Sequence, residues 1–221
     1  MSLNGSILSS YLSIYLSAAW MTLQIAGLGI LLSALVGLAA SMFSYYRVPV
    51  LRQITAVYIE ISRNTPLLVQ LFFLYFGLPK IGIRLSGFAC AVIGTAFLGG
   101  SYMAESFRSG LEAVDQSQIE SAESLGMSRL QIMWHVVFPQ ALALSVPGLF
   151  ANIIFLIKET SVVSAIALPD LMYAAKDLIG NDYNTGEALF LLVAAYLCIL
   201  LPISLFARFT ERRLRYAGFG N

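Results

Sequence analysis

Residues 18–44 of the chain read AAWMTLQIAGLGILLSALVGLAASMFS, a run without a single charged side chain. No charged residue occurs anywhere between Met1 and Tyr46. About 20 consecutive apolar residues are enough for a helix to cross the hydrocarbon core of a bilayer. The whole chain of 221 residues has this character, with 58% hydrophobic residues, 11% charged residues and a mean hydropathy of +0.79. Soluble proteins carry about 25% charged residues, so the sequence predicts a helical integral membrane protein.

Further uncharged runs follow at 64–79, 85–104, 130–157 and 188–207. We therefore expect an all-α integral membrane fold in a single domain over residues 1–221. The five transmembrane helices that we expect lie at about 18–44, 54–78, 86–108, 138–158 and 187–208. The second is the least regular, because Glu60 and Arg63 interrupt its apolar run and Pro66 should kink it.

The first span carries small side chains at a regular spacing. Gly29, Ser33 and Gly37 recur every four residues, which lets another helix approach closely. We favour packing within the chain over contact with a second chain. Residues 1–17 are apolar and aromatic, and we expect them to lie on the outer surface of the membrane.

Basic residues indicate the orientation, because they are enriched on the cytoplasmic side of membrane proteins. With five spans, eight arginines fall on one side: Arg47, Arg52, Arg108, Arg129, Arg208, Arg212, Arg213 and Arg215. Only Lys80, Arg84 and Lys176 fall on the other. The pattern predicts an outer N-terminus and a cytoplasmic C-terminus, with residues 159–187 outside as short helices and turns.

A polar segment at residues 115–130 separates two apolar runs on the predicted cytoplasmic side. It contains the sequence IESAESLGMS at 119–128. Two capping-box spacings, Ser117 with Glu120 and Ser128 with Gln131, predict two short helices at an angle. Gly126 stands where the first helix would end in a left-handed residue.

This segment is either a docking surface for a partner or a simple connector between spans, and the residues alone favour neither. A small apolar face flanked by two carboxylates is typical of a docking surface. The residues that we expect to form it are Ile119, Glu120, Ala122, Glu123, Leu125, Gly126 and Met127.

Ionisable residues at membrane depth form the second candidate site. Each costs several kcal/mol unless it is paired or faces a wet cavity. They are Glu60, Arg63, Glu105, Arg108, Lys158 and Glu159. Each of the first two Glu–Arg pairs has a spacing of three and can pair on one helix face, which is the interpretation we favour for them.

Lys158 and Glu159 differ from these pairs, because adjacent helical residues do not face each other. They need outside partners, unless Lys158 extends to the membrane interface. Asn64 and Thr65 beside the first group, and Thr160 and Ser161 beside the second, add hydrogen-bonding side chains. Both signs of charge together with hydroxyls suit a zwitterionic ligand.

Several catalytic patterns do not occur in the sequence, among them G-x-x-x-x-G-K-[ST] for nucleotide phosphates and H-E-x-x-H for zinc. His135 is the single histidine, and Cys90 and Cys198 lie far apart. We therefore expect no catalytic site, no metal site and no cofactor bound by this chain. Energy for any transport must come from a partner or from an ion gradient.

The segment at 119–128 with the later Pro139 resembles the Glu-Ala-Ala loop of ABC importer membrane subunits, with Ser121 in place of the first alanine. Three further stretches resemble the permeases of polar amino acid importers in particular. They are YIEISRNTPLLVQLFFLYFGLP at 58–79, SYMAESFRSGLEAV at 101–114 and FLIKETSVVSAI at 155–166.

The resemblance implies a type I ABC importer permease fold in the bacterial inner membrane, with residues 115–130 as a cytoplasmic coupling segment. It implies two ATP-binding subunits that hold ATP and Mg, a second permease chain, identical or different, an extracytoplasmic solute-binding protein and surrounding lipid, but no nucleic acid. It also implies an amino acid substrate. The expected substrate path comprises Glu60, Arg63, Asn64, Thr65, Tyr102, Lys158, Glu159, Thr160 and Ser161.

Three alternatives remain open at this point. One is a permease for another small polar solute. Another is an ion-coupled secondary transporter with Glu60 or Glu105 as proton carrier, for which five spans without an internal repeat are few. The third is a structural or assembly subunit.

Overall fold

The computed structural model describes residues 5–214, and every regular element among them is helical. Four helical stretches are long and apolar enough to cross a membrane. They are α1 (Gly5–Tyr45), α4 (Gly87–Glu112), the run Arg129–Ile166 that contains α7 (Phe138–Glu159), and α9 (Thr185–Leu214). Arg215, one of the eight arginines expected on the cytoplasmic side, lies outside the described residues.

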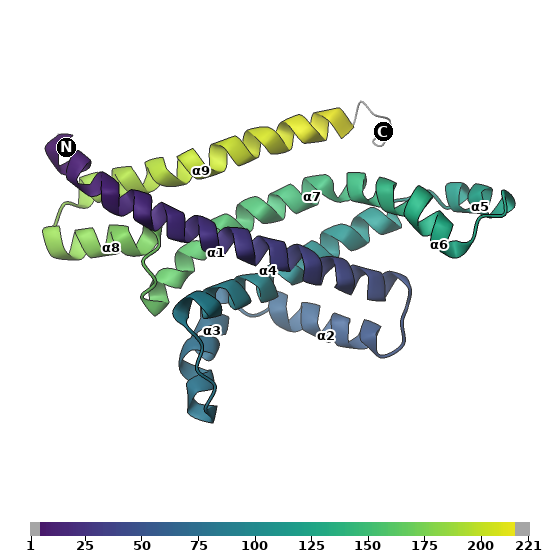
Figure 1. Ribbon diagram of the computed structural model, residues 1–221, viewed down its shortest axis with the longest axis horizontal. Helices are drawn as coiled ribbons and strands as arrows, with labels where there is room; N and C mark the ends of the chain where they lie inside the picture. Colours follow the sequence, from purple (N-terminus) through teal and green to yellow (C-terminus); the bar gives the residue numbers. More distant parts are fainter. Residues whose placement is uncertain (1–4, 215–221) are drawn as a thin grey trace.

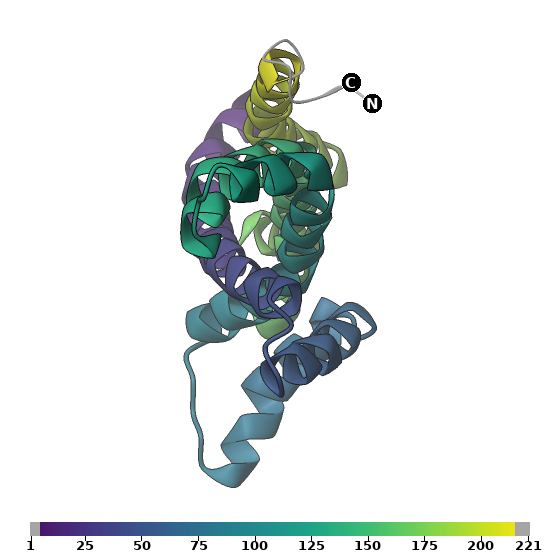
Figure 2. The same cartoon turned by 90° about the vertical axis from the view of Figure 1, so that its right-hand side faces the viewer.

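The expected second span is broken. It consists of α2 (Leu51–Arg63) and α3 (Leu67–Phe72), continued by a π-helical turn (Phe73–Gly77) and a 3-10 turn (Leu78–Ile81). Pro66 is extended, with φ −57° and ψ 143°, so the helix ends and a new one begins where only a kink was expected. Figures 1 and 2 show α2 and the segment from α3 onward below the bundle.

The predicted close helix contact occurs within the chain, between α1 and α4. A Cβ on Gly37 would lie 2.5 Å from Met103 Cβ, and one on Gly99 would lie 2.2 Å from Ser33 Oγ. The Ser33 hydroxyl donates to the carbonyl oxygens of Gly29 (2.7 Å) and Thr95 (3.3 Å). Small residues on both helices therefore bring the two backbones together.

The first described residues of α1 belong to the helix bundle, whereas residues 1–17 were expected to lie on the outer surface of the membrane. Residues 5–17 continue the helix and pack on α8 (Leu171–Asp182) and α9 (Figure 1). The Tyr11 hydroxyl donates to Asp182 Oδ2 (2.6 Å), and the buried Tyr15 hydroxyl donates to the Ala188 carbonyl (2.5 Å). These bonds explain why aromatic residues occur before the span.

The two ends of the bundle differ in content. One end carries the start of α1, the 3-10 helix at Thr160–Ile166, and α8. The other carries α5 (Gln116–Ser124), α6 (Arg129–Ile132) and a π-helical turn (Met133–Val137), together with the ends of α1 and α9 (Figure 1). Most of the arginines expected on the cytoplasmic side belong to elements that meet at this second end.

Candidate functional site

Residues 115–130 form the helix–turn–helix that the capping signals predicted, with one correction. Asp115 caps α5 by accepting the Ser117 N–H at 2.9 Å, so the expected capping box of Ser117 with Glu120 is wrong. This backbone hydrogen bond lowers the pKa of the Asp115 carboxyl. A carboxylate two residues earlier caps the helix and also interacts favourably with its dipole.

The remaining signals are confirmed. Gly126 has φ +78°, and the N–H groups of Gly126 and Met127 donate to the carbonyls of Glu123 (2.9 Å) and Ala122 (3.2 Å), which is a Schellman motif. The second capping box is present: Gln131 Oε1 accepts the Ser128 N–H at 2.8 Å, and Ser128 Oγ accepts the Gln131 N–H at 3.4 Å.

The expected docking residues point in two directions. Ile119, Ala122 and Met127 pack into the chain's own core, against the cluster that includes Leu111 and Ile132. The carboxylates and Leu125 face outward, as does Gly126. Only one side of α5 is therefore available to a partner.

The exposed side of residues 115–134 carries more large apolar side chains than the sequence suggested. Leu125 is 82% exposed, Leu130 67% and Trp134 58%, and all three lie beyond the end of α4. Sequence reasoning missed Trp134, because one aromatic residue after a capping box is indistinguishable from the start of the next span. Leu125 lies outside the four candidate spans, and an exposed large apolar side chain in such a place is typical of a protein interface.

A polar contact fixes this helix–turn–helix to the bundle. Gln140 on α7 donates from Nε2 to Gln118 Oε1 on α5 and to the Val136 carbonyl at 2.9 Å. This hydrogen bond links α5 directly to the start of α7. The segment is suited to mechanical coupling.

The break between α2 and α3 is held by one side chain that the sequence did not single out. Gln70 Nε2 donates to the carbonyls of Ser62 (3.2 Å) and Thr65 (2.9 Å), which the proline turn leaves without helical partners. The Ser62 hydroxyl donates to the Phe97 carbonyl on α4 at 2.9 Å. A glutamine in an apolar run gives no signal that it will bind a turn five to eight residues earlier.

The charged residues near the break do not all pair as expected. Arg63 Nη1 lies 3.6 Å from Glu105 Oε2 on α4, and its guanidinium lies over the Tyr102 ring, 5.1 Å from the centroid. Glu60 instead accepts a hydrogen bond from Asn64 Nδ2 at 3.1 Å. The expected Glu60–Arg63 pair is therefore wrong, because α2 ends at Arg63 and α4 supplies the nearer carboxylate.

The second expected pair is confirmed and extended. Arg108 donates to Glu105 one turn earlier and to Glu112 one turn later, the latter at 2.9 Å. Together with Arg63 these residues form a row of alternating charge from the helix break to the end of α4. Asn152 on α7 donates to the Tyr102 carbonyl beside this row at 3.1 Å.

Residues 158–161 are less open than the expected cavity requires. Lys158 is exposed and Glu159 is half-buried, but Thr160 is buried and its hydroxyl donates to the Ile157 carbonyl at 2.7 Å. Ser161 is partly exposed at the start of the 3-10 helix. Thr160 therefore supports the helix end, and Lys158 and Glu159 carry the free charge.

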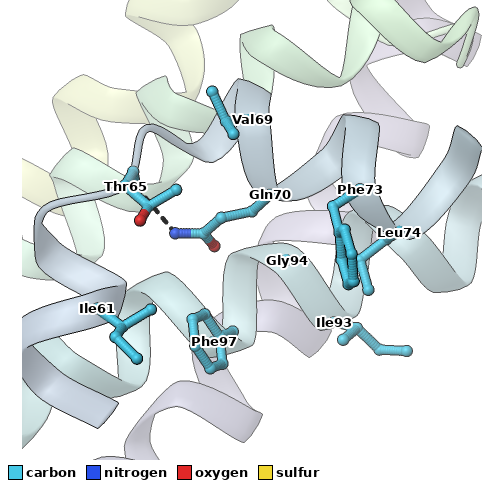
Figure 3. Close-up of a pocket in the computed structure, with 9 residues that line it drawn as sticks. All are labelled: Ile61, Thr65, Val69, Gln70, Phe73, Leu74, Ile93, Gly94 and Phe97. Carbon is cyan, nitrogen blue, oxygen red and sulfur yellow. Dashed lines mark hydrogen bonds between the residues drawn. The ribbon is translucent and has the colours of Figure 1, made fainter. Parts of the chain in front are cut away.

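A cavity of about 410 Å³ lies in the angle between α2, α3 and α4 (Figure 3). Its lining is mainly apolar, with Ile61, Phe73 and Phe97 around the Thr65 and Gln70 side chains. Residues 158–161 do not line it. Of the expected substrate path, the cavity thus includes Thr65 alone.

Residues 29–216 match the sequence profile of the family described as "binding-protein-dependent transport system inner membrane component". The probable glutamine ABC transporter permease protein GlnP of Bacillus subtilis (strain 168) is 38% identical over 213 residues, 93% of this chain and 98% of that protein. The probable amino-acid ABC transporter permease protein y4tF of Sinorhizobium fredii (strain NBRC 101917 / NGR234) is 36% identical over 201 residues, 87% of this chain and 84% of that protein.

Solved structures give the same grouping. A chain from the crystal structure of an amino acid ABC transporter with histidines superposes with a TM-score of 0.88 at 32% identity, covering 96% of this chain and all of that one. A chain of the MetNI methionine ABC transporter in an inward-facing conformation has a TM-score of 0.79 at 18% identity, covering 93% of this chain and 98% of that one. The second likeness concerns the fold alone.

Proposed function

The chain belongs to the family of binding-protein-dependent transport system inner membrane components, and we propose that it forms the membrane path of an ABC importer for polar or charged amino acids. The substrate class rests on the names of the relatives and on the charged groups at the α2–α4 contact. A zwitterion needs partners for an ammonium and for a carboxylate. Arg63, Glu105 and the Lys158–Glu159 pair offer both signs of charge.

In this proposal the ATP-binding subunits act on the permease through the exposed side of residues 115–134. ATP and Mg are bound by two partner subunits in the cytoplasm, one against each permease chain. Leu125, Leu130 and Trp134 seat in the partner, and Glu120 and Glu123 border the contact. Closure of the ATP-binding subunits would move α5, and the Gln118–Gln140 contact would pass that movement to α7.

A second permease chain, identical or different, completes the path. The side chains of Arg63 and Glu105 are 40% and 38% exposed in the single chain, although their helices belong to the apolar bundle. Charges of that kind do not face lipid. A second chain would enclose them in a wet passage that opens alternately outward, to a solute-binding protein, and inward.

The observation that carries this proposal is the exposure of Leu125 at a capped helix end. Replacing Leu125 with Asp should abolish copurification of the ATP-binding subunit, because burying an unpaired carboxylate opposes docking. Gln116→Asp adds the same charge at the exposed start of α5 and serves as the control. Full copurification with Leu125→Asp would mean that the segment is only a connector.

A further inference from the structure

The turn between α1 and α2 contains a pocket of about 360 Å³ that two arginines line. Arg47 and Arg52 border it together with Pro49, Val50 and the Gln53 amide. Both arginines are exposed, and neither takes part in an ion pair within residues 5–214. Two arginines thus border one pocket, and the described part of the chain gives neither of them an ion-pair partner.

The backbone at this turn is unusual for the residues it holds. Arg47 has φ +51°, and the N–H groups of Arg47 and Val48 donate to the carbonyls of Ser44 (3.2 Å) and Phe43 (3.1 Å), which closes a Schellman motif on α1. Glycine adopts this conformation without strain. An arginine is therefore unfavourable for the turn itself, which points to a role for its side chain.

An apolar stripe leads away from the pocket along α2. Ile54, Val57 and Ile61 are spaced by three and four residues on α2, so they share one face. Val50, the N-cap residue, precedes Ile54 by four positions, and all four side chains are at least 55% exposed. At 1.5 Å per residue the stripe is about 16 Å long, close to the roughly 15 Å of hydrocarbon in one leaflet. Its far end, Ile61, borders the apolar cavity of Figure 3.

The pocket lies where lipid headgroups are expected. The uncharged run of α1 ends at Tyr46, and the turn follows at the end of the bundle that carries α5 and α6 (Figure 1). Guanidinium groups bind phosphate oxygens in pairs of hydrogen bonds. An apolar stripe that starts below two arginines complements a phosphate with an acyl chain attached.

We propose that this surface binds an anionic phospholipid, with its phosphate between Arg47 and Arg52 and one acyl chain along Val50, Ile54, Val57 and Ile61. The proposal does not depend on which substrate the importer carries. It requires only that α1 and α2 lie in a bilayer.

The test is native mass spectrometry of the purified permease complex in a neutral detergent, titrated with dioleoylphosphatidylglycerol or dioleoylphosphatidylcholine. The wild-type complex should bind the anionic lipid more tightly. Replacing both arginines with glutamine should weaken that binding about 30-fold, since each basic residue near an anionic surface contributes roughly a factor of five. Binding of phosphatidylcholine should stay unchanged.

A matched control removes the same charge elsewhere. Arg208→Gln with Arg212→Gln on α9 should retain selective binding of phosphatidylglycerol. Arg47→Gly distinguishes the role of the charge from that of the turn. Glycine suits φ +51°, so this variant should keep or raise the melting temperature in detergent. It should still weaken lipid binding, because the guanidinium is gone.

Three results would overturn the proposal. One is equal affinity of the Arg47/Arg52 double variant and the wild type for phosphatidylglycerol. Another is competition by inorganic phosphate as effective as that of the lipid, which would indicate a free-anion site. The third is loss of the ATP-binding subunit from the double variant with unchanged lipid binding, which would place the arginines in the subunit contact.

Discussion

Arg63 of α2 reaches Glu105 of α4 with 3.6 Å between Nη1 and Oε2, and within residues 5–214 this is the one ion pair that joins two helices. Glu105 is shared with Arg108, which also binds Glu112. As a surface pair it would contribute at most about 1 kcal/mol. The Arg63–Glu105 pair lies beside the helix break, so it matters more as a connection between α2 and α4 than as a contribution to the free energy of unfolding.

Removing either charge of this pair should impair uptake more than assembly. We expect Arg63→Gln and Glu105→Gln each to lower amino acid uptake in proteoliposomes at least several-fold, because each removes the ionic contact between α2 and α4 from the proposed passage, and Glu105→Gln also leaves Arg63 without a carboxylate partner. Glu112→Gln removes a carboxylate at the end of the same row and serves as the control. Uptake unchanged in both variants would limit the pair to a structural role.

The parts of the fold that the sequence predicted are those with local causes. Uncharged length predicted the long helices, and the Gly29–Ser33–Gly37 spacing predicted a close contact that the structure places against α4. The Schellman glycine and the second capping box were also predictable, because each depends on residues within a few positions of each other.

The features that were missed depend on tertiary contacts. The i,i+3 rule paired Arg63 with Glu60, whereas the packing of α2 on α4 provides Glu105. No local pattern indicates that Gln70 will bind the carbonyls of a turn at Ser62, or that Gln140 will contact Gln118 across a loop. Asp115 and Ser117 are both good caps, and local pattern alone did not decide between them.

The left-handed conformation of Gly126 gives a second prediction. Its Cβ position is open, so Gly126→Ala is disfavoured only by φ +78°, a cost of about 1 kcal/mol. Substrate-stimulated ATPase activity and uptake should fall about fivefold if that strain tilts α5 against its partner. Gly180→Ala in α8 makes the same change in open space without a positive φ, and it should be neutral. Equal behaviour of the two variants would contradict a coupling role for the turn.

A third prediction concerns Asp170, which caps α8 by accepting the Tyr173 N–H at 2.9 Å and is fully buried. Burial raises the pKa of the Asp170 carboxyl to about 6. The unfolded value is near 3.9, so the folded protein binds more protons between these values. Stability should therefore fall as pH rises from about 4 to about 6 and stay level above that.

Asp170→Asn keeps a side-chain acceptor for the cap and removes the charge. Above pH 6 it should be more stable than the wild type by up to about 3 kcal/mol, and the difference should shrink towards pH 4. Melting temperatures in detergent from pH 4.5 to 8 measure this. Asp170→Ala loses the cap and should be destabilised by about 1 kcal/mol relative to Asp170→Asn at every pH. A difference between wild type and Asp170→Asn that does not vary with pH would rule out titration of this group.

A fourth prediction concerns the membrane topology. Arginines are concentrated at the end of the bundle that carries α5, so we expect this end to be cytoplasmic. A reporter active only in the cytoplasm should work when fused after Leu214 and be silent at the N-terminus. The reverse result would place residues 115–130 outside and remove the proposed contact with ATP-binding subunits. A second fusion in the loop after Ile81 should be silent, since Lys80 and Arg84 belong to the opposite side.

The last prediction concerns Lys158 and Glu159, whose side chains diverge from adjacent positions at the end of α7. Lys158 is exposed and Glu159 half-buried, and neither appears in an ion pair within the described part of the chain. If they receive the substrate's charged groups, Lys158→Met and Glu159→Gln should each reduce uptake while basal ATPase activity and assembly persist. Glu159→Gln should affect uptake of a cationic amino acid more than that of a neutral one, because it removes negative charge from the path.

Thr160→Val is the matched control for the helix end, since the Thr160 hydroxyl donates to the Ile157 carbonyl. Unchanged substrate affinity and uptake rate in both charge-removal variants, at matched protein levels, would mean that this pair anchors α7 at the interface and that the substrate binds elsewhere.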